Sequence, residues 1–236
     1  MRIQKYLSIC GVCSRREAER LIDERKIYVN GELVSKKGME VTGNESIEVL
    51  GVNVKPTQKE YYLLNKPRGV ISSSKDEKNR ETVVDLVKSK TKVYPIGRLD
   101  YDTTGIILLT NDGELTNKLT HPSSNIEKEY LAKVKGFFDK KDAVALSNGI
   151  VLEGQKTKKA SFKLHQYDRK TDTSYVKVIL TEGRNHQVKD MFKKLNYDVL
   201  KLTRVRYAFL TTVGLKSGEY RKLDTKEVKT LYSLVK

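Results

Sequence analysis

The sequence predicts an α+β protein, in which a small N-terminal αα-β unit precedes a larger domain built on a mixed, mostly antiparallel sheet. Three observations lead to this fold class. Segments with strand alternation are scattered among segments with helical spacing, without the strict βαβ order of a parallel sheet. Hydrophobic residues make up 38% of the 236 residues, which is enough to form a core. The stretch 51–59 has little periodicity and contains Pro56, so we interpret it as a linker between domains at 1–50 and 60–236.

The N-terminal unit is predicted to contain two helices and a hairpin. The first helix covers residues 2–9. The second begins at Ser14, where Glu17 stands three residues later, as in a capping box. Asn30-Gly31 lies between two short apolar runs, which is the pattern of a β-hairpin with a two-residue turn.

The first half of the larger domain is predicted to contain a buried central strand. Strands are expected at 61–65 and 70–73, on either side of a turn at 66–69. The continuous apolar run at 105–110 is typical of a strand that is buried on both faces, and a short helix should follow at 112–120.

The second half is predicted to contain strands at 128–135 and 174–181, with a helix between them that begins at Asp139 and ends at Gly149. The first of these strands alternates, so Tyr130 is expected on its inner face.

An amphipathic helix is then predicted at 186–195, and a short helix at the C-terminal end. Four residues of the amphipathic helix recur at helical spacing and should face the core: Val188, Met191, Phe192 and Leu195. Three lysines are expected to point outward into solvent: Lys189, Lys193 and Lys194.

The charge of the chain predicts a polyanionic partner. Lysine and arginine total 46 against 30 acidic residues, a formal charge of +16, which favours nucleic acid first and an acidic membrane surface second. No apolar run is long enough to span a bilayer, and the N-terminus lacks the apolar stretch of a signal peptide. We therefore expect a cytoplasmic protein with no membrane partner, and ribosomes are the largest polyanion there.

Basic residues gather in two places. Arg15, Arg16 and Arg20 stand at the start of the predicted second helix, where they could follow an RNA backbone or form an ordinary solvated helix face. The stretch 184–229 carries twelve basic and five acidic residues, so it is a second candidate track for a nucleic-acid strand.

The two cysteines, Cys10 and Cys13, have the spacing Cys-x-x-Cys. A zinc site would need two more ligands nearby, and the three histidines lie far downstream. We interpret the pair as small residues at a helical turn and predict no metal.

The segment GRLDYDTTG at 97–105 is the strongest candidate for a catalytic site, because a polar loop leads directly into a rigid buried strand. Asp100 and Asp102 could serve as an acid/base pair, a magnesium site, or a nucleophile with a neighbour, and a capped turn explains the residues equally well. In an extended segment the intervening residue would point the two carboxylates to opposite sides, which disfavours a magnesium-dependent nuclease or phosphotransferase.

Several motifs occur in one order along the chain. They are YLLNKPRG at 62–69, YPIGRLDYDTTGIILLTNDGE at 94–114, KEY at 128–130, EGRNHQVK at 182–189 and LTR at 202–204. Together they resemble the RsuA/RluB family of ribosomal RNA pseudouridine synthases. Residues 1–49 resemble the S4 RNA-binding domain that usually precedes the catalytic domain in that family. The resemblance covers nearly the whole chain.

The resemblance implies an enzyme that breaks the C1′–N1 bond of a uridine in RNA, turns the uracil and rejoins it through C5, without a metal or other cofactor. Asp100 would be the essential carboxylate, Arg184 its arginine partner, and Tyr130 the aromatic residue that stacks on the target base. These roles fit physical chemistry, because a nearby arginine keeps a carboxylate ionised and stacking holds a flipped base.

The resemblance also implies substrate-binding residues around this site, and we expect Lys66, Arg98, Leu202 and Arg204 to take part. Two departures from the family pattern stand out. His186 occupies a position where many members carry arginine, and Tyr207-Ala208 replaces an apolar-glycine pair.

The motifs favour members that act on large-subunit ribosomal RNA over the small-subunit type. A non-catalytic S4-type ribosome-binding protein is the main alternative from another class. It is disfavoured because a pure RNA binder has no use for an ionised carboxylate that faces phosphate. We expect a monomer.

Overall fold

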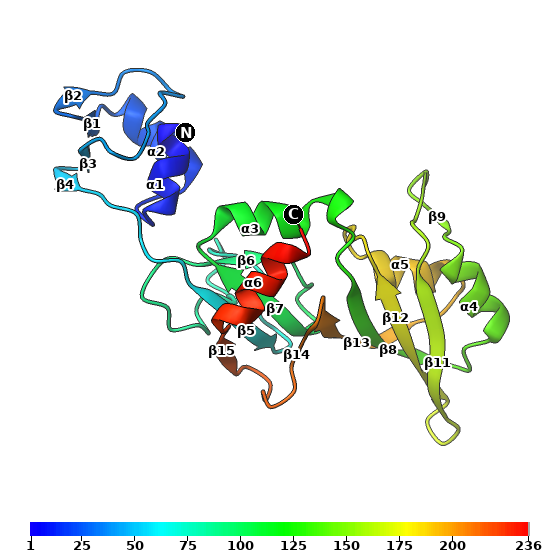
Figure 1. The fold of residues 1–236 in the computed structure, drawn as a ribbon. Helices are drawn as coiled ribbons and strands as arrows, with labels where there is room; N and C mark the ends of the chain where they lie inside the picture. The colour runs from blue at the N-terminus through cyan, green and yellow to red at the C-terminus, as the bar shows by residue number, and fades with distance from the viewer. Residues whose placement is uncertain (236) are drawn as a thin grey trace. The chain divides into compact units, whose positions relative to one another are not determined.

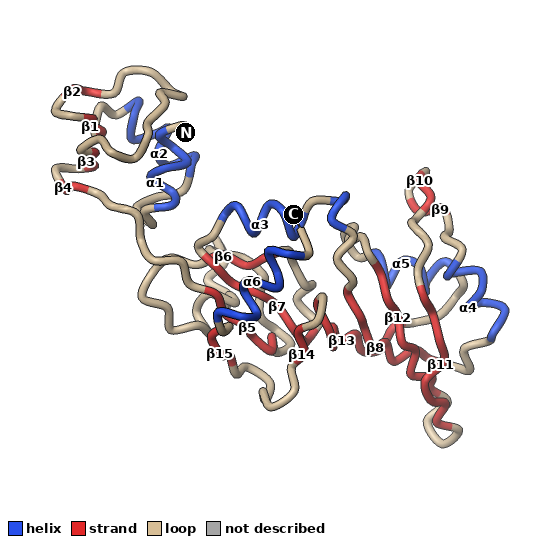
Figure 2. The backbone as a smooth tube through the Cα atoms, in the orientation of Figure 1, coloured by secondary structure: helices blue, strands red, loops and turns tan. Residues whose placement is uncertain are grey.

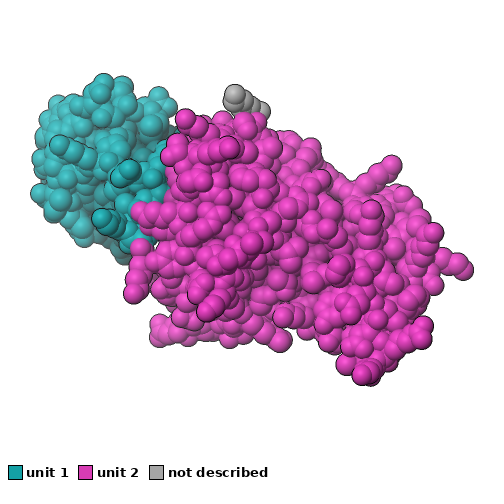
Figure 3. Space-filling model, turned by 60° about the horizontal axis from the view of Figure 1, so that its bottom comes forward, with its two compact units in different colours: residues 1–60, 89–93, 110–113 teal, residues 61–88, 94–109, 114–236 magenta. Residues whose placement is uncertain are grey.

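The computed structural model describes residues 1–235, which form two compact units (Figure 3). The first unit comprises residues 1–60, 89–93 and 110–113, and the second contains the rest of the described chain. Figure 1 follows the chain from the N-terminal unit into the larger one.

The N-terminal unit packs two helices against a four-stranded sheet of order β2-β1-β3-β4. Its elements are α1 (Ile3–Ile9), α2 (Arg15–Asp23), β1 (Ile27–Val29), β2 (Glu32–Leu33), β3 (Ile47–Val49) and β4 (Val52–Asn53). Ser14 caps α2, and its side chain accepts a hydrogen bond from the backbone N–H of Glu17 at 3.1 Å. The two predicted helices are confirmed.

The predicted hairpin is also confirmed, since Asn30 and Gly31 have φ angles of 51° and 82° and join β1 to β2. The predicted linker, in contrast, begins inside the fold of this unit. Strand β4 pairs with β3, and Val54 is buried in the same core.

The larger unit is built on a nine-stranded sheet with the path β11-β12-β8-β13-β7-β5-β15, to which β14 and β6 are added at β13 and β7 (Figure 2). Strands β13 and β7 pair in parallel, whereas the pairs β11–β12, β12–β8, β8–β13 and β15–β5 are antiparallel. The predicted mixed, mostly antiparallel sheet is therefore confirmed. The strands are β5 (Tyr61–Lys66), β6 (Tyr94–Ile96), β7 (Thr104–Thr110), β8 (Lys128–Lys135), β11 (Ser161–Asp168), β12 (Thr173–Leu180), β13 (Val199–Tyr207), β14 (Leu210–Thr211) and β15 (Tyr220–Lys222).

Helices cover this sheet in two groups. Helices α3 (Gly113–Thr120) and α6 (Thr225–Ser233) share a core with β5 and β7, in which Leu115 and Leu231 are fully buried. Helices α4 (Lys140–Ser147) and α5 (Gln187–Lys194) lie near the β11 end, where Phe192 of α5 makes edge-on ring contacts with Phe138 and Phe162 (Figure 1). A separate hairpin, β9 (Val151–Leu152) and β10 (Gln155–Lys156), forms a two-stranded sheet of its own.

Most elements predicted for this unit are present, including the buried strand β7 and the alternating strand β8. The strand predicted at 70–73 was wrong. This stretch makes a single β-bridge, from Ile71 to Thr82. The Ser72 hydroxyl hydrogen-bonds to the backbone of Leu99, and this contact holds the segment as a loop.

Candidate active site

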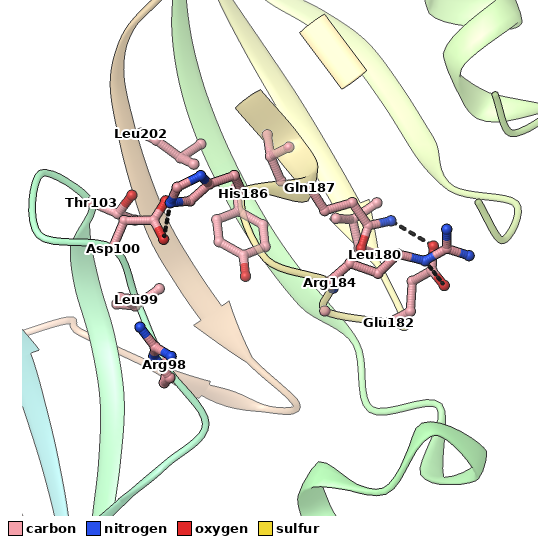
Figure 4. Close-up of a pocket in the computed structure, with 13 residues that line it drawn as sticks. Arg98, Leu99, Asp100, Thr103, Leu180, Glu182, Arg184, His186, Gln187 and Leu202 are labelled. Atoms are coloured by element: carbon pink, nitrogen blue, oxygen red, sulfur yellow. Dashed lines mark hydrogen bonds and ion pairs between the residues drawn. The ribbon is translucent and has the colours of Figure 1, made fainter. Parts of the chain in front are cut away.

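One pocket of the larger unit gathers most of the residues that the sequence singled out (Figure 4). Its lining comes from the loop before β7, from β8 and β13, and from the end of β12 through the first turn of α5. The lining residues are Arg98, Leu99, Asp100, Thr103, Tyr130, Leu180, Glu182, Gly183, Arg184, His186, Gln187, Val188 and Leu202.

Strand β13 brings distant parts of the sequence together at this pocket. It lies between β8 and β7, with Arg204 opposite Tyr130 on one side and opposite Gly105 on the other. Tyr130 and Leu202 are 9% and 5% exposed, so the pocket has an aromatic and an aliphatic wall. A flat apolar wall of this kind suits the face of a nucleobase.

Lys66, at the end of β5, holds the loop that carries Asp100 through hydrogen bonds to its backbone. The Lys66 ammonium is fully buried and donates hydrogen bonds to the carbonyl oxygens of Pro67, Asp100 and Thr103 at 3.1, 3.1 and 2.9 Å. The Ser72 hydroxyl fixes the same loop, because it donates to the carbonyl of Leu99 and accepts from its N–H. The backbone around Asp100 is thus rigidly positioned.

Two basic side chains, those of Lys189 and His186, flank the Asp100 carboxylate. The Nζ atom of Lys189 lies 3.0 Å from Oδ2, and Nε2 of His186 lies 3.5 Å from Oδ1. The same Lys189 ammonium contacts Asp102 Oδ1 at 2.5 Å. Helix α5 supplies Lys189, and His186 immediately precedes that helix.

This geometry corrects two expectations. Lys189 does not point outward into solvent, because its Nζ lies 3.0 Å from Asp100 Oδ2 and only 25% of its side chain is exposed. Asp100 and Asp102 do not diverge either. The segment between them is a turn instead of an extended strand, so both carboxylates reach one ammonium.

The charges in this cluster shift one another's pKa values. The hydrogen bond from Lys189 is the largest cause that lowers the pKa of Asp102. Burial opposes the charge of Lys189, but hydrogen bonds to Asp102 and Asp100 outweigh it and raise the pKa of Lys189. Burial lowers the pKa of Lys66 to about 8, although the nearby Asp100 and Asp102 act in the other direction.

The resemblance implied that Arg184 pairs with Asp100. In the structure Arg184 lines the pocket but does not pair with Asp100. Its Nε lies 3.6 Å from Glu182 Oε2, and its two Nη atoms donate to the backbone carbonyls of Gln155 and Lys156 on β10. The reason is that the turn after β12 directs this side chain toward the β9–β10 hairpin (Figure 4). Lys189 occupies the position beside Asp100 instead.

The other expected substrate-binding residues divide into two groups. Arg98 and Leu202 line the pocket. Lys66 and Arg204 are interior residues: Arg204 is 3% exposed, donates from Nε to the Ile106 carbonyl at 2.8 Å and stacks on the Tyr207 ring. Their side chains support the sheet and the loop, so a direct contact with RNA is not available to them in this structure.

The three arginines of the N-terminal unit that were expected to bind RNA also differ from one another. Arg15 and Arg16 are exposed at the start of α2. Arg20 forms ion pairs with Glu17 and Glu24 on the same helix, so its charge is already partly neutralised.

Sequence reasoning missed Lys189 as an active-site residue. A signal was present, because Lys189 follows His186 by three residues and residues at this spacing share a helix face. Gln187 was missed as well. It is buried, accepts from the Arg184 N–H at 3.0 Å and donates to Glu182 at 2.5 Å, and so holds the turn that shapes the pocket.

No group of three or more His, Cys, Asp or Glu residues within the described residues 1–235 is arranged to hold a metal ion. Cys10 and Cys13 are buried free thiols in the N-terminal core, where burial raises the pKa of each. No helix in the described part of the chain is long and apolar enough to cross a membrane.

The pocket combines a clamped carboxylate with an aromatic and an aliphatic wall, as in an enzyme site that takes a flat ring. Comparison with known proteins identifies the family. Residues 60–194 match the family model described as RNA pseudouridylate synthase, and residues 1–47 match the S4 domain. The chain therefore belongs to the RNA pseudouridylate synthase family, and the resemblance inferred from its motifs is confirmed.

Individual relatives are similar over nearly the whole chain. The ribosomal large subunit pseudouridine synthase B of Bacillus subtilis (strain 168) is 49% identical over 99% of this chain and 96% of its own length. The dual-specificity RNA pseudouridine synthase RluF of Escherichia coli (strain K12) is 34% identical over 100% of this chain and 79% of its own length. A crystal structure of a pseudouridylate synthase superposes with a TM-score of 0.71 at 30% identity, covering 98% of this chain and 99% of that one.

Proposed function

We propose that this protein isomerises a uridine of large-subunit ribosomal RNA to pseudouridine, with Asp100 as the reacting carboxylate and Tyr130 stacked on the target base. The observation that carries the proposal is the position of Asp100. It lies on a backbone-clamped loop, in the same pocket as Tyr130 and Leu202, with an ammonium at 3.0 Å. An ionised carboxylate on a rigid support beside a base-binding wall is what glycosidic bond cleavage at a uridine requires.

The chemistry has two possible first steps. In one, an Asp100 oxygen forms a bond to C1′ of the ribose as the C1′–N1 bond breaks. In the other, that oxygen takes a proton from the sugar as the same bond breaks. In both, the electron pair of the C1′–N1 bond leaves with the uracil and Asp100 loses its negative charge. The uracil then turns and its C5 bonds to C1′. On the first route the Asp100–C1′ bond breaks and its electron pair returns to Asp100; on the second Asp100 gives its proton back to the sugar. C5 loses its proton to solvent and N1 gains one, so the product is an isomer of the starting nucleotide.

The basic groups beside the Asp100 carboxylate suit both first steps. Lys189 stabilises the ionised carboxylate before reaction, and hydrogen bonds from charged donors are the strong ones. The His186 ring lies near the other carboxylate oxygen, with Nε2 at 3.5 Å. The reaction is a redox-neutral isomerisation, so its atoms and electrons balance without a co-reactant.

The choice of large-subunit ribosomal RNA is supported by the similarity to the Bacillus subtilis large-subunit enzyme over nearly the full length of both proteins. The printed name of the RluF relative describes dual specificity. The motifs leave small-subunit ribosomal RNA as the alternative substrate within the same reaction.

The remaining parts of the proposal concern organisation. We assign RNA docking to the N-terminal S4 domain and chemistry to the domain that begins at residue 60, with strand β4 and Val54 of the predicted linker 51–59 belonging to the N-terminal fold. Arg98 at the pocket and Arg15 and Arg16 at the start of α2 are exposed and suited to phosphate contacts. We propose that the protein acts as a monomer in the cytoplasm, where ribosomal RNA is made and assembled.

The test uses purified protein and separate transcripts of large- and small-subunit ribosomal RNA, with pseudouridines mapped by carbodiimide modification and primer extension. We expect one strong site in large-subunit RNA and none with Asp100→Asn. A site that appears only in small-subunit RNA would overturn the substrate assignment. RNA binding with no pseudouridine in either transcript would instead support the non-catalytic alternative.

A further inference from the structure

Lys189 is shared between two carboxylates, and its shorter contact is not with the reacting one. The ammonium lies 2.5 Å from Asp102 and 3.0 Å from Asp100. Asp102 itself accepts from Lys189 and lies within the electrostatic influence of Arg68. Near Asp100, the Lys66 ammonium bonds to the backbone carbonyl and the His186 ring lies 3.5 Å from the carboxylate. The role of Asp100 does not by itself explain why Asp102, two residues later, should compete for the Lys189 ammonium.

Competition has a cost before the reaction and a benefit after it. Because Asp100 shares the Lys189 ammonium with Asp102, the ionised form of Asp100 is stabilised less than it would be by an unshared ammonium. Both first steps then remove the negative charge of Asp100, while Lys189 remains charged with a side chain only 25% exposed. A partly buried cation that loses its counterion is strongly disfavoured.

We propose that Asp102 is a positioning residue that acts through Lys189. It holds the ammonium beside Asp100 before the C1′–N1 bond breaks and neutralises that ammonium once Asp100 has lost its charge. This role rests on the proposed function, because it requires Asp100 to be the group that is neutralised. Asp102 is not expected to touch the substrate, since its proposed action passes entirely through the lysine.

The decisive experiment is a double-mutant cycle on the full-length protein. Single-turnover rates on saturating RNA are measured for the wild type, Asp102→Asn, Lys189→Met and the double variant, with incubations of many hours so that slow variants remain measurable. We expect Asp102→Asn to lower this rate by about tenfold, which is the change expected when one charge-assisted hydrogen bond is lost from the transition state. In the Lys189→Met background the same change should lower the rate by less than about twofold, because the residue through which Asp102 acts is gone.

A second measurement does not depend on activity. Lysine labelled with ¹³C at Cε allows the Lys189 resonance to be assigned by its loss in Lys189→Met and followed by NMR as the pH is raised. Because the Asp102 hydrogen bond helps to raise the pKa of Lys189, Asp102→Asn should lower that pKa. Asp198→Asn removes a negative charge from an exposed position after α5 and is the matched control, which should change neither the pKa nor the rate.

Two outcomes overturn the proposal. Equal rate losses from Asp102→Asn in the wild-type and Lys189→Met backgrounds would show that Asp102 acts independently of Lys189. An unchanged pKa of Lys189 in Asp102→Asn would show that the contact has no electrostatic consequence. Failure of the proposed function is recognised separately, because it would appear as pseudouridine formation that survives Asp100→Asn.

Discussion

At the scale of single residues, the charged side chains around Asp100 have different tasks although they lie close together. Lys189 contacts the carboxylate, Lys66 holds the backbone of the loop beneath it, and Arg184 binds the carbonyls of a neighbouring hairpin. Sequence position alone does not separate these tasks, because each of the three residues stands in a motif of the family. The direction in which each side chain leaves the backbone determines which of these contacts it makes.

The distinction between Lys189 and Arg184 predicts unequal effects of their removal. Lys189→Met should lower the single-turnover rate by roughly 100-fold, because a partly buried carboxylate loses its charged donor. Arg184→Met removes contacts to Glu182 and to β10, and should lower that rate by less than about tenfold. Both rates are measured on saturating RNA. A larger loss from Arg184→Met than from Lys189→Met would restore Arg184 as the partner of Asp100.

The buried Lys66 predicts an alkaline limit to activity. Its pKa is lowered from 10.5 to about 8, so raising the pH through 8 converts an ammonium with three N–H groups into an amine with two. Fewer loop carbonyls can then be held, and we expect the single-turnover rate to fall as the pH rises from 7 to 9.

Loss of folding does not explain that decline. Between pH 8 and 10.5 the folded chain binds fewer protons at Lys66 than the unfolded chain, so the contribution of Lys66 to stability rises with pH in this window. A thermal melt at each pH separates the two effects. If the rate stayed constant to pH 9, protonated Lys66 would not be needed to hold the loop.

At the scale of elements, β13 organises the site, and it is one of the strands that sequence patterns did not reveal. The run VLKLTRVRY places Lys201, Thr203 and Arg204 in a strand that lies inside the sheet, so neither a continuous apolar run nor a clean alternation is visible. Arg204 is tolerated there because its Nε donates to the Ile106 carbonyl and its guanidinium lies over Tyr207. Strand β11 was missed for a similar reason, since it lies at the edge of the sheet and is largely exposed.

Elements with a strong local signal were predicted well. The buried run of β7, the alternation of β8 and the cap of α4 by Asp139 each follow from a short stretch of sequence. The parts of the site that depend on them, Asp100 and Tyr130, were likewise placed in one pocket as expected. The Lys189 contact depends on how α5 meets the Asp100 loop, which is a long-range feature that local patterns do not contain.

The close approach of β7 to β13 predicts a severe effect of a small substitution. A Cβ atom at Gly105 would lie 2.2 Å from the Arg204 carbonyl oxygen, and the φ angle of +104° is itself unfavourable for an L-residue. Gly105→Ala should therefore lower the free energy of unfolding by roughly 2–5 kcal/mol.

The matched control is Gly113→Ala at the start of α3, where a Cβ atom meets nothing within 4 Å and φ is not positive. Alanine favours a helix by about 0.5–1 kcal/mol over glycine, so this change should be neutral or slightly stabilising. Chemical denaturation of both variants gives the comparison. Equal stabilities would mean that the two strands separate easily at Gly105.

At the scale of the whole molecule, the formal charge of +16 is distributed unevenly, since residues 1–50 are nearly neutral and the rest of the chain is strongly basic. Residues 1–50 carry nine bases and eight acids. The contribution of the S4 domain to RNA binding should therefore come from a few exposed bases, since its overall charge is small. Arg15 and Arg16 are the best placed, because Arg20 is engaged with Glu17 and Glu24.

Neutralising these two exposed bases should weaken RNA binding without affecting chemistry. Arg15→Gln with Arg16→Gln should make the dependence of log Kd on log salt shallower by about 1.4, at about 0.7 for each lost phosphate contact on a single strand. The single-turnover rate at saturating RNA should stay unchanged. Arg20→Gln is the control and should change the slope by less than about 0.7. An unchanged slope in the double variant would mean that this helix start faces solvent.

The central claim is that Asp100 is the carboxylate that reacts with the target uridine, and release of tritium from RNA labelled at C5 of uridine tests it most directly. Every turnover replaces the C5–H bond by a bond to C1′, so the label passes into water. We predict steady release by the wild-type protein and none above background by Asp100→Asn, while the variant keeps its fold and binds the same RNA. Tritium release by a folded Asp100→Asn protein at a rate near that of the wild type would contradict the account.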